Sequence, residues 1–566
     1  MLLARLVKGN SLHYLTIVLC AVVAHGLLLL NDGIYWDDWV WFDLRNNAYH
    51  SDRVFAASEE MGSLPYEKYF GRLFSIFPSK VIASKFFVFL AIVAVGLALF
   101  RICRASGYFD RRESLLIAVI AIVYPANKTQ VVMSTAFYQI YLAVFLVACQ
   151  IALENVIIPR SRARFVVLRV SSIVLFFVSF SMTSLIVFFF CFMLFLLYRS
   201  YTQLPAGDSF IKKVRRSLSG NIDYLLAPIA FWLVKSTLFH PYGYYEGYRQ
   251  LQASPQTILQ AMKELIAVGT YGQFEFVIDL VKSRVFPWMT IPSYVYLLFA
   301  IVTIFGYGLV IRKAAITRQN VFHLLGPLAF ALMLVAAAIL PYAVIGHSSS
   351  YFGMDTRNLI LLGIPMAMLL VASLRVSNRA SDGHLSTAGA SLLVLPIVGF
   401  ILVLTQSYLH WELRWIKDLS VMRQLGQSDS ARGVSVFRID DRFYTRIGDE
   451  SYQFYEWSGM FYHINGTEAT VGLDLEVFPD PDRFLTQSGG KWFVERYNLR
   501  DFDPYGCQAL LTISRGLHAP SVGLVYRYYY LKFFGSQEEL NDYLSQVADV
   551  EVTPVRSPVA RHCPAD

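Results

Sequence analysis

The sequence predicts an all-α polytopic membrane protein with a small α+β domain at its C-terminus. Three observations lead to this prediction. The 566 residues are 55% hydrophobic and only 16% charged, whereas a soluble domain has about 25% charged residues. Long apolar runs recur over the N-terminal two thirds, and basic residues gather in alternate loops between them. From residue 408 the pattern changes to short alternating stretches, which are typical of strands.

A helix needs about 20 mainly apolar residues to cross a bilayer, and about eleven runs approach that length. We expect the first run to be retained, because no small-residue cleavage site follows it. Some runs are short or closely joined, so a count differing by one or two is also compatible with the sequence. The runs are 12–30, 81–102, 113–126, 131–152, 166–181, 183–198, 223–239, 292–311, 322–345, 358–374 and 386–407.

Loop charge predicts the orientation of these helices. Every second loop is rich in Lys and Arg, and such loops usually face the cytoplasm. An odd helix count then gives a cytoplasmic N-terminus and an extracytoplasmic C-terminal domain, in the plasma (inner) membrane. The net charge of +8 is thus interpreted as a topology signal, and no nucleic-acid partner is expected. The predicted parts are a membrane module, 1–407, with outer loops 31–79 and 240–290, and an outer domain, 408–566.

The outer domain has alternating stretches at 434–439, 468–472 and 521–527, and a helical pattern at 537–547. These patterns predict strands followed by a helix. No glycine-rich phosphate loop, CxxC or HExxH motif occurs in the sequence, so nucleotide hydrolysis and a structural zinc site are unsupported.

Two of the six cysteines fall on the predicted outer face, where disulfides persist. Cys507 and Cys563 are therefore expected to pair. Two free thiols remain the alternative, because Cys563 lies in a tail that need not be ordered.

The most informative stretch is NDGIYWDDWVWF at 31–42. Asp37 and Asp38 lie there among aromatic residues that include Trp36 and Trp39. Buried carboxylates need partners, so the combination predicts an aromatic-walled cleft at the outer membrane surface. The bland alternative is an aromatic belt with two solvated aspartates. The rest of the loop, 43–79, has the amphipathic pattern of interfacial helices.

Other polar groups fall at the predicted outer helix ends. Cations suited to a phosphate are expected at Lys128, Lys235, Arg249 and Arg357. Residues suited to a sugar or acceptor are His240, Tyr244, Tyr245, Glu246 and Asp355, together with Trp36 and Trp39. Each has a structural alternative: a lysine reaching the interface, a packed tyrosine-rich loop, or an Arg357–Asp355 ion pair.

Such a set of residues suits sugar transfer from a lipid-linked sugar phosphate. Phosphate is a good leaving group, so one carboxylate base for the attacking hydroxyl is the main acid–base requirement. Cations, or a metal, should stabilise the charge that builds on the departing phosphate. We favour Asp38 as the base, with Asp37 orienting the acceptor or sharing a divalent cation with it. No cofactor is otherwise predicted.

The layout resembles the GT-C superfamily of integral-membrane glycosyltransferases. The matching features are a first helix followed by a long outer loop that opens on an acidic pair, Asp37 and Asp38, then about ten helices and an outer domain. The resemblance implies that one of the two aspartates is catalytic, that the donor is a polyprenyl-phosphate-linked sugar, and that the anomeric centre is inverted. Asp32 is a third nearby acid and blurs the assignment.

The predicted function is thus transfer of a sugar to a cell-envelope glycan or glycolipid on the outer face. Two other classes stay open. A transporter or flippase of lipid-linked sugars would be expected to place ionisable residues near the bilayer midplane, in repeated halves. Another envelope enzyme, such as an O-antigen ligase or polymerase or an acyltransferase, would need an arginine-rich cleft or an embedded histidine.

Overall fold

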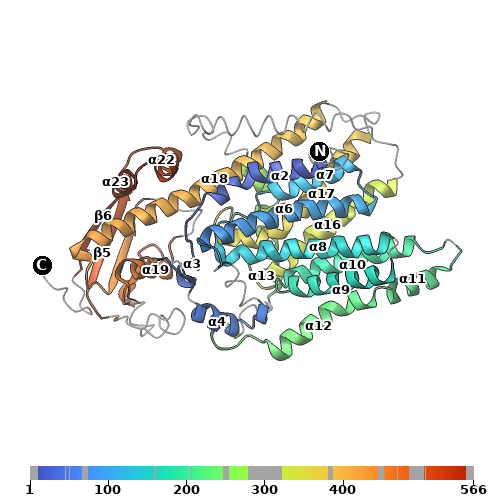
Figure 1. Ribbon diagram of the computed structural model, residues 1–566, viewed down its shortest axis with the longest axis horizontal. Coiled ribbons are helices and arrows are strands. Elements are labelled where there is room, and N and C mark those ends of the chain that lie inside the picture. Colours follow the sequence, from blue (N-terminus) through green and yellow to red (C-terminus); the bar gives the residue numbers. More distant parts are fainter. Residues whose placement is uncertain are drawn as a thin grey trace.

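A bundle of long helices makes up most of the computed structural model, and a sheet with its own helices lies at one end of the bundle (Figure 1). The structure describes residues 11–44, 46, 48–49, 51–66, 74, 76–158, 161–205, 207–246, 254–277, 321–379, 387–443, 451–467, 469–483, 503 and 505–555.

The bundle helices coincide with the predicted apolar runs, except for run 292–311, which lies outside the described residues. Their bounds are α2 (Ser11–His25) continued by the 3-10 turn η1 (Gly26–Leu29), α6 (Lys80–Ser106), α7 (Arg111–Val123), η2 (Met133–Thr135) leading into α8 (Ala136–Ile157), α9 (Arg162–Ser179), α10 (Ser184–Thr202), α12 (Ile222–Leu238), α16 (Val321–Val344), and η4 (Met354–Leu362) leading into α17 (Gly363–Arg379). Shorter elements are α11 (Phe210–Ser219), η3 (Gly243–Tyr245) and α13 (Pro255–Gly269).

Within the described residues, six helices are long and apolar enough to cross a membrane. The number becomes seven if α11 and α12, which meet at a 47° bend, are taken as one span. The chain is thus a multi-pass membrane protein in character, while the predicted count of about eleven spans is not established.

Local sequence signals explain where these helices begin and end. Ser79 caps α6 by accepting from the Ile82 N–H, and Gly107 ends the helix in the left-handed conformation, φ 74°. Asp110 and Glu113 form a reciprocal capping box at the start of α7. Each cap satisfies backbone groups that a helix end leaves unpaired.

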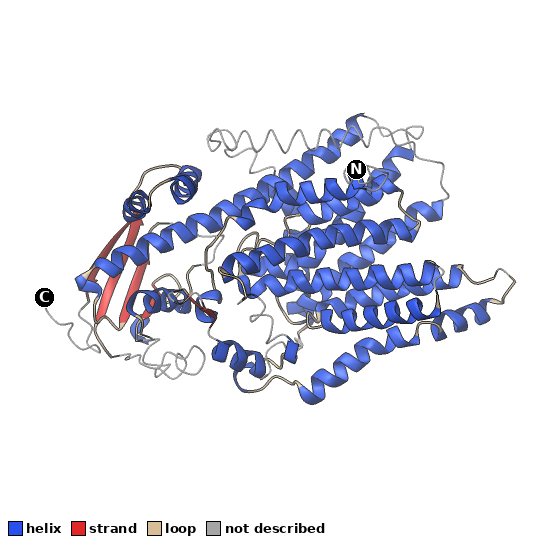
Figure 2. Cartoon of the chain, in the orientation of Figure 1, coloured by secondary structure: helices blue, strands red, loops and turns tan. Residues whose placement is uncertain are grey.

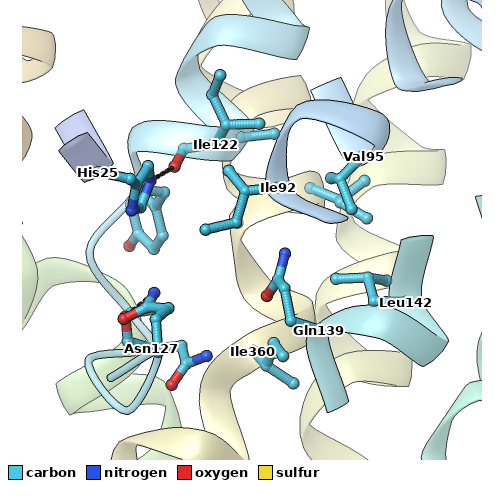
Figure 3. A pocket seen from close by; sticks show the side chains of 14 residues that line it. His25, Ile92, Val95, Ile122, Asn127, Gln139, Leu142 and Ile360 are labelled. Atoms are coloured by element: carbon cyan, nitrogen blue, oxygen red, sulfur yellow. Dashed lines mark hydrogen bonds between the residues drawn. The ribbon is translucent and has the colours of Figure 1, made fainter. Parts of the chain in front are cut away.

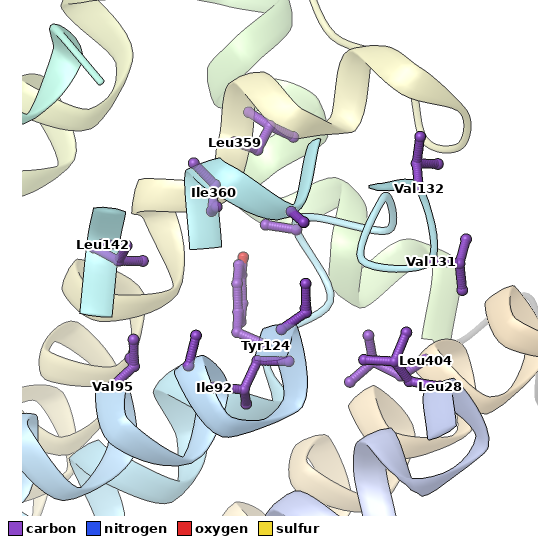
Figure 4. Packing of buried hydrophobic residues seen from close by; sticks show 14 of the residues in the cluster. Leu28, Ile92, Val95, Tyr124, Val131, Val132, Leu142, Leu359, Ile360 and Leu404 are labelled. Atoms are coloured by element: carbon purple, nitrogen blue, oxygen red, sulfur yellow. The ribbon is translucent and has the colours of Figure 1, made fainter. Parts of the chain in front are cut away.

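Apolar side chains from several helices interlock in the centre of the bundle (Figure 4). Ile92 of α6, Leu142 of α8 and Leu404 approach the region of Tyr124 from different sides. The Tyr124 hydroxyl donates to the carbonyl oxygen of Gly269 at 2.7 Å, so this polar group within the apolar cluster is paired.

Helix α18 joins the two parts of the protein, because it runs without a break over Thr387–Gln427, 41 residues. The predicted domain boundary at residue 408 therefore falls inside a continuous helix. Apolar residues dominate its first half. Its second half carries the buried charged residues Glu412, Arg414, Lys417 and Asp418 into the outer domain.

The outer domain is built on a four-stranded sheet in the order β4-β3-β5-β6 (Figure 2). Strand β3 pairs in parallel with β4 and β5, and β6 pairs antiparallel with β5. The domain is therefore α+β, as predicted for this region. The bounds are β3 (Val436–Asp441), β4 (Val471–Asp474), β5 (Gln508–Arg515), β6 (Ala548–Pro554), α19 (Phe454–Asn465), α22 (Ser521–Phe534), α23 (Gln537–Val547) and the turn η5 (Asp429–Ala431).

One strand prediction in this domain was wrong. Residues 521–527 begin helix α22, with Leu524, Val525 and Tyr528 buried on one face. The spacing of these three residues is helical, and the alternating pattern over seven residues hid it. The predicted helix at 537–547 coincides with α23.

The first outer loop lies between the bundle and the outer domain (Figure 1). It contains the short helix α3 (Asp38–Trp41), the two-residue strands β1 (Phe42–Asp43) and β2 (Ala48–Tyr49), and α4 (Ser51–Glu60). Helix α3 packs on α19 of the outer domain. The loop that carries the acidic pair is therefore enclosed on two sides.

Candidate functional site

A buried polar network fixes the start of the first outer loop. Lys85 of α6 donates to the side-chain oxygen of Asn31 and, at 2.8 Å, to the carbonyl oxygen of Gly33. Asn31 donates in turn to Glu412 at 2.5 Å and to the Tyr35 hydroxyl at 2.8 Å. Sequence reasoning missed Lys85 and Glu412. Lys85 sits inside an apolar run, and an intramembrane lysine was the signal that could have found it.

Gly33 is required at its position because the backbone is closely surrounded. A Cβ atom there would lie 2.2 Å from the Tyr35 hydroxyl and 2.9 Å from the Cβ of Trp415. The surroundings of the loop thus leave no space for a side chain at residue 33.

Trp36 adopts a left-handed backbone conformation, with φ 53°. Such a conformation costs on the order of 1–3 kcal/mol for a bulky residue and tends to occur at functional sites. Its N–H donates to Glu456 Oε1 at 3.0 Å, and Glu456 pairs with Arg414 at 2.7 Å. Because both charged side chains are nearly fully buried, the outer domain holds Trp36 firmly in this conformation.

The two aspartates that follow the turn at Trp36 differ in their surroundings. Asp38 is 1% exposed, and its two carboxylate oxygens accept the backbone N–H groups of Met133 and Ser134, each at 2.8 Å. Asp38 therefore caps the first turn of the helix that begins at Met133, where a negative charge is favourable. Asp37 is half-buried at the start of α3, with its carboxylate outside this helix cap.

Burial raises the pKa of the Asp38 carboxyl to about 7, although the N–H groups of Met133 and Ser134 lower it. A base must receive its proton on an accessible oxygen. Both Asp38 oxygens already accept a backbone N–H group.

Arg357 is the predicted phosphate ligand that the structure brings to the first loop. Its guanidinium carbon lies 4.8 Å from the centre of the Trp36 ring, within the range of a cation–π contact. Tyr455 of the outer domain packs edge-on against the same ring, with the ring centres 6.4 Å apart. Arg357 and Tyr455 therefore both contact the Trp36 ring, and Asp37 follows Trp36 directly in the chain. Asp355, two residues before Arg357, is exposed.

Lys128 is fully buried beside the segment that carries Arg357. Its backbone N–H donates to the Thr356 hydroxyl at 3.1 Å. Its ammonium group donates to the carbonyl oxygen of Tyr351 and faces the ring of Phe352, 4.6 Å from the ring centre. Burial lowers the pKa of Lys128 to about 7.

Trp39 does not have the sugar-stacking position that we predicted. It is 4% exposed and packs against Trp415, with the ring centres 6.0 Å apart. A Cβ atom on Gly459 of α19 would lie 2.7 Å from the Cβ of Trp39. The Trp39 ring is thus part of the contact between the first loop and the outer domain. Trp36 remains partly accessible.

The other predicted residues group around α4. The Tyr242 N–H donates to the Glu60 carbonyl oxygen at 2.9 Å, which places loop 240–246 on the end of that helix. His240 and Glu246 are exposed and Tyr245 is half-buried. Lys235 lies about one turn earlier, on α12. Arg249 and the side chain of Tyr244 lie outside the described part of the chain.

A polar cavity of about 40 Å³ lies inside the bundle beneath the turn that carries Lys128 (Figure 3). His25, Asn127 and Gln139 line it, and the side-chain oxygen of Gln130 has no protein partner. The cavity has room for ordered water. It is far smaller than a sugar or lipid site, which needs several hundred Å³.

No group of three or more His, Cys, Asp or Glu residues that could hold a metal ion occurs in the described residues. The pair Asp37–Asp38 does not form a shared ligand set either, because the Asp38 oxygens face N–H groups. Cys507 is disulfide-bonded. Its predicted partner, Cys563, lies outside the described residues, so the pairing stays a prediction.

A second polar contact joins the outer domain to the residues that follow η1. Lys532 of α22 pairs with Asp32 at 2.8 Å, and the Tyr528 hydroxyl lies 3.4 Å from the other Asp32 oxygen. Asp32 is therefore engaged in the contact between α22 and the start of the first loop.

Comparisons with known proteins were made at the level of sequence and of structure. No family model and no curated protein matches the chain. ArnT from Cupriavidus metallidurans bound to undecaprenyl phosphate is similar in structure, with 10% identity, a TM-score of 0.36, and coverage of 98% of this chain and 100% of that one. The oligosaccharyltransferase of Archaeoglobus fulgidus, tethered to an acceptor peptide, has 14% identity, a TM-score of 0.35, and coverage of 90% and 70%. TM-scores this low assign no activity or residue role to this chain.

Proposed function

We propose that this protein is a GT-C-type membrane glycosyltransferase that moves a sugar from a polyprenyl-phosphate donor to a glycan or glycolipid acceptor of the cell envelope. One observation carries the proposal. Asp37 follows the strained Trp36, and the Trp36 ring packs against the guanidinium of Arg357. A half-buried carboxylate thus directly follows the aromatic residue that contacts the Arg357 cation, at one end of a bundle of apolar helices.

Asp37 acts as the base. It takes the proton of the acceptor hydroxyl as that oxygen attacks the anomeric carbon of the sugar. The bond from this carbon to the phosphate oxygen breaks, and the electron pair leaves with the lipid phosphate. Attack from the face opposite the phosphate inverts the anomeric centre.

Arg357 receives the charge that develops on the leaving phosphate, because its planar fork can donate two parallel hydrogen bonds. Lys128 holds the 351–357 segment through Tyr351 and Thr356, and in its protonated form it adds a positive charge beside this segment. The partly accessible Trp36 ring offers an apolar face for the sugar. Asp38 positions the site by joining the first loop to the helix that begins at Met133.

The proposed compartment is the plasma (inner) membrane, with the reaction on the outer face. The concentration of Lys and Arg in every second loop of the sequence supports this orientation. The alternatives of a lipid-linked sugar transporter and of a ligase-type enzyme give opposite results in the test below.

The test is transfer activity of Asp37→Asn and Asp38→Asn variants, read as envelope glycan masses in a deletion strain. We expect Asp37→Asn to lose about 10²–10⁴-fold in rate while the protein stays folded in the membrane. Asp38→Asn should act mainly through stability, since an amide replaces a helix-capping carboxylate.

Asp32→Asn serves as the matched control, because it removes a carboxylate from the same loop outside the proposed catalytic position. A wild-type glycan pattern for both Asp37→Asn and Asp38→Asn would refute the first-loop base. Loss of the glycan together with an accumulating lipid-linked sugar on the inner face would point to a transporter.

A further inference from the structure

Helix α11 separates its side chains into two faces. At 3.6 residues per turn, its apolar residues fall within about 100° of one another, and its basic residues occupy the other side. The apolar residues are Phe210, Ile211, Val214 and Leu218, and the basic residues are Lys212, Lys213, Arg215 and Arg216.

The protein leaves most of this apolar face uncovered. The side chains of Phe210 and Ile211 are 69% and 78% exposed, and that of Leu218 is 41% exposed. Buried Ser217, at the edge of the apolar face, donates to the Leu197 carbonyl oxygen of α10 at 2.8 Å, and the Phe210 ring contacts the Tyr201 ring with the ring centres 6.0 Å apart. The bundle therefore holds α11 along one edge of its apolar face and leaves the rest of that face exposed.

The position of α11 fits a helix that lies at a membrane surface. The helix lies at the end of the bundle opposite the sheet (Figure 1) and meets α12 at a 47° bend. Helix α12 continues the apolar exposure with Ile222, Leu226 and Ile229, each more than half exposed. An outward apolar face thus runs from α11 along the bundle, as expected where lipid surrounds the protein.

The charges select the kind of lipid. Asp208 pairs with Lys212 at 2.6 Å and with Arg216 at 2.5 Å, which leaves a clear positive excess on the helix. Lys213 contacts the ring of Tyr201, and Arg215 is exposed. Basic residues at a bilayer surface attract anionic head groups.

We propose that α11 is an interfacial helix that inserts Phe210 and Ile211 into the leaflet opposite the outer domain and binds anionic phospholipid through Lys213 and Arg215. The occupant is the lipid surface itself and not a partner protein. This inference is independent of the proposed transferase activity.

The insertion is tested by spin labels on the full-length protein in nanodiscs of phosphatidylcholine and phosphatidylglycerol. Ile211→Cys reports the apolar face, and Ser219→Cys on the polar face is the matched control. The free cysteines of the described residues are at most 7% exposed, and the parent protein gives the labelling background. We expect the label at 211 to be accessible to oxygen and protected from a water-soluble nickel complex, and the label at 219 to show the reverse.

Lipid selectivity is tested by the retention of phosphatidylglycerol over phosphatidylcholine in native mass spectrometry. Lys213→Gln/Arg215→Gln should weaken the preference about 30-fold. The control Lys263→Gln/Arg432→Gln removes two exposed cations from α13 and from the turn after α18, away from α11, and should leave the preference unchanged. Three outcomes would overturn the proposal: nickel access at 211, protection of 211 from both reagents, which would indicate a protein partner or second copy, or an equal loss in the control.

Discussion

Replacing Lys128 by Met should make the protein more stable and less active. Burial lowers the pKa of Lys128 from 10.5 to about 7. At 1.36 kcal/mol per pKa unit, the buried lysine costs on the order of 4 kcal/mol at neutral pH. Methionine fills a similar volume without a charge. It leaves the Tyr351 carbonyl oxygen and the Gln273 side-chain oxygen unpaired, at about 1 kcal/mol each. A net gain of about 2 kcal/mol in the free energy of unfolding is expected at pH 7.

The stability gained by replacing Lys128 with Met should decrease as the pH rises. Between pH 7 and 10.5 the unfolded chain keeps a proton on Lys128 that the folded protein has lost. The stability of the wild-type protein therefore rises with pH over this window. The methionine variant has no such group, so its advantage should be full at pH 7 and below and should vanish near pH 10.

Thermal unfolding in detergent with a thiol-reactive dye measures this difference, because the buried free cysteines become reactive on unfolding. Lys263→Met, which removes an exposed lysine from α13, is the control and should leave Tm unchanged. Transfer activity of Lys128→Met should fall by about 10²-fold, the loss typical of one group that stabilises a developing anion. A variant that is less stable than the wild type at pH 7, or whose advantage does not change with pH, would refute the reasoning.

Two further predictions concern the contacts between the domains. Glu456→Gln leaves Arg414 buried without its carboxylate and should lower the free energy of unfolding by about 3 kcal/mol or more. Adding Arg414→Met to this variant should restore much of the lost Tm. An unchanged Tm in the single variant would contradict the role of this pair. Asp32→Asn breaks a partly exposed pair with Lys532, worth at most about 1 kcal/mol, so transfer should stay within about tenfold of wild type. A loss as large as that of Asp37→Asn would transfer the role of base to Asp32.

Hydrophobic periodicity predicted most of the bundle, because a membrane helix must satisfy its backbone internally and present apolar side chains to lipid. The positions of helices α6, α8 and α12 follow from this rule alone. Residues 521–527 show its limit. Valine and tyrosine favour strands locally, yet contacts of Leu524 and Tyr528 within the folded domain select a helix.

The candidate site was only partly predictable from the sequence. An acidic pair among aromatic residues identified the loop, but two adjacent aspartates are equivalent in sequence. Their difference depends on the left-handed turn at Trp36 and on the N–H groups of Met133 and Ser134, 95 and more residues away along the chain. Glu456 could not be linked to this loop either, since 420 residues separate it from Trp36.

The unbroken course of α18 also determines how the two parts of the protein can move. A helix of 41 residues is a rod about 60 Å long, anchored by apolar packing at one end and by buried ion pairs such as Arg414–Glu456 at the other. A rod of this kind works as a lever. A tilt of α18 within the bundle would therefore also move the sheet at its other end.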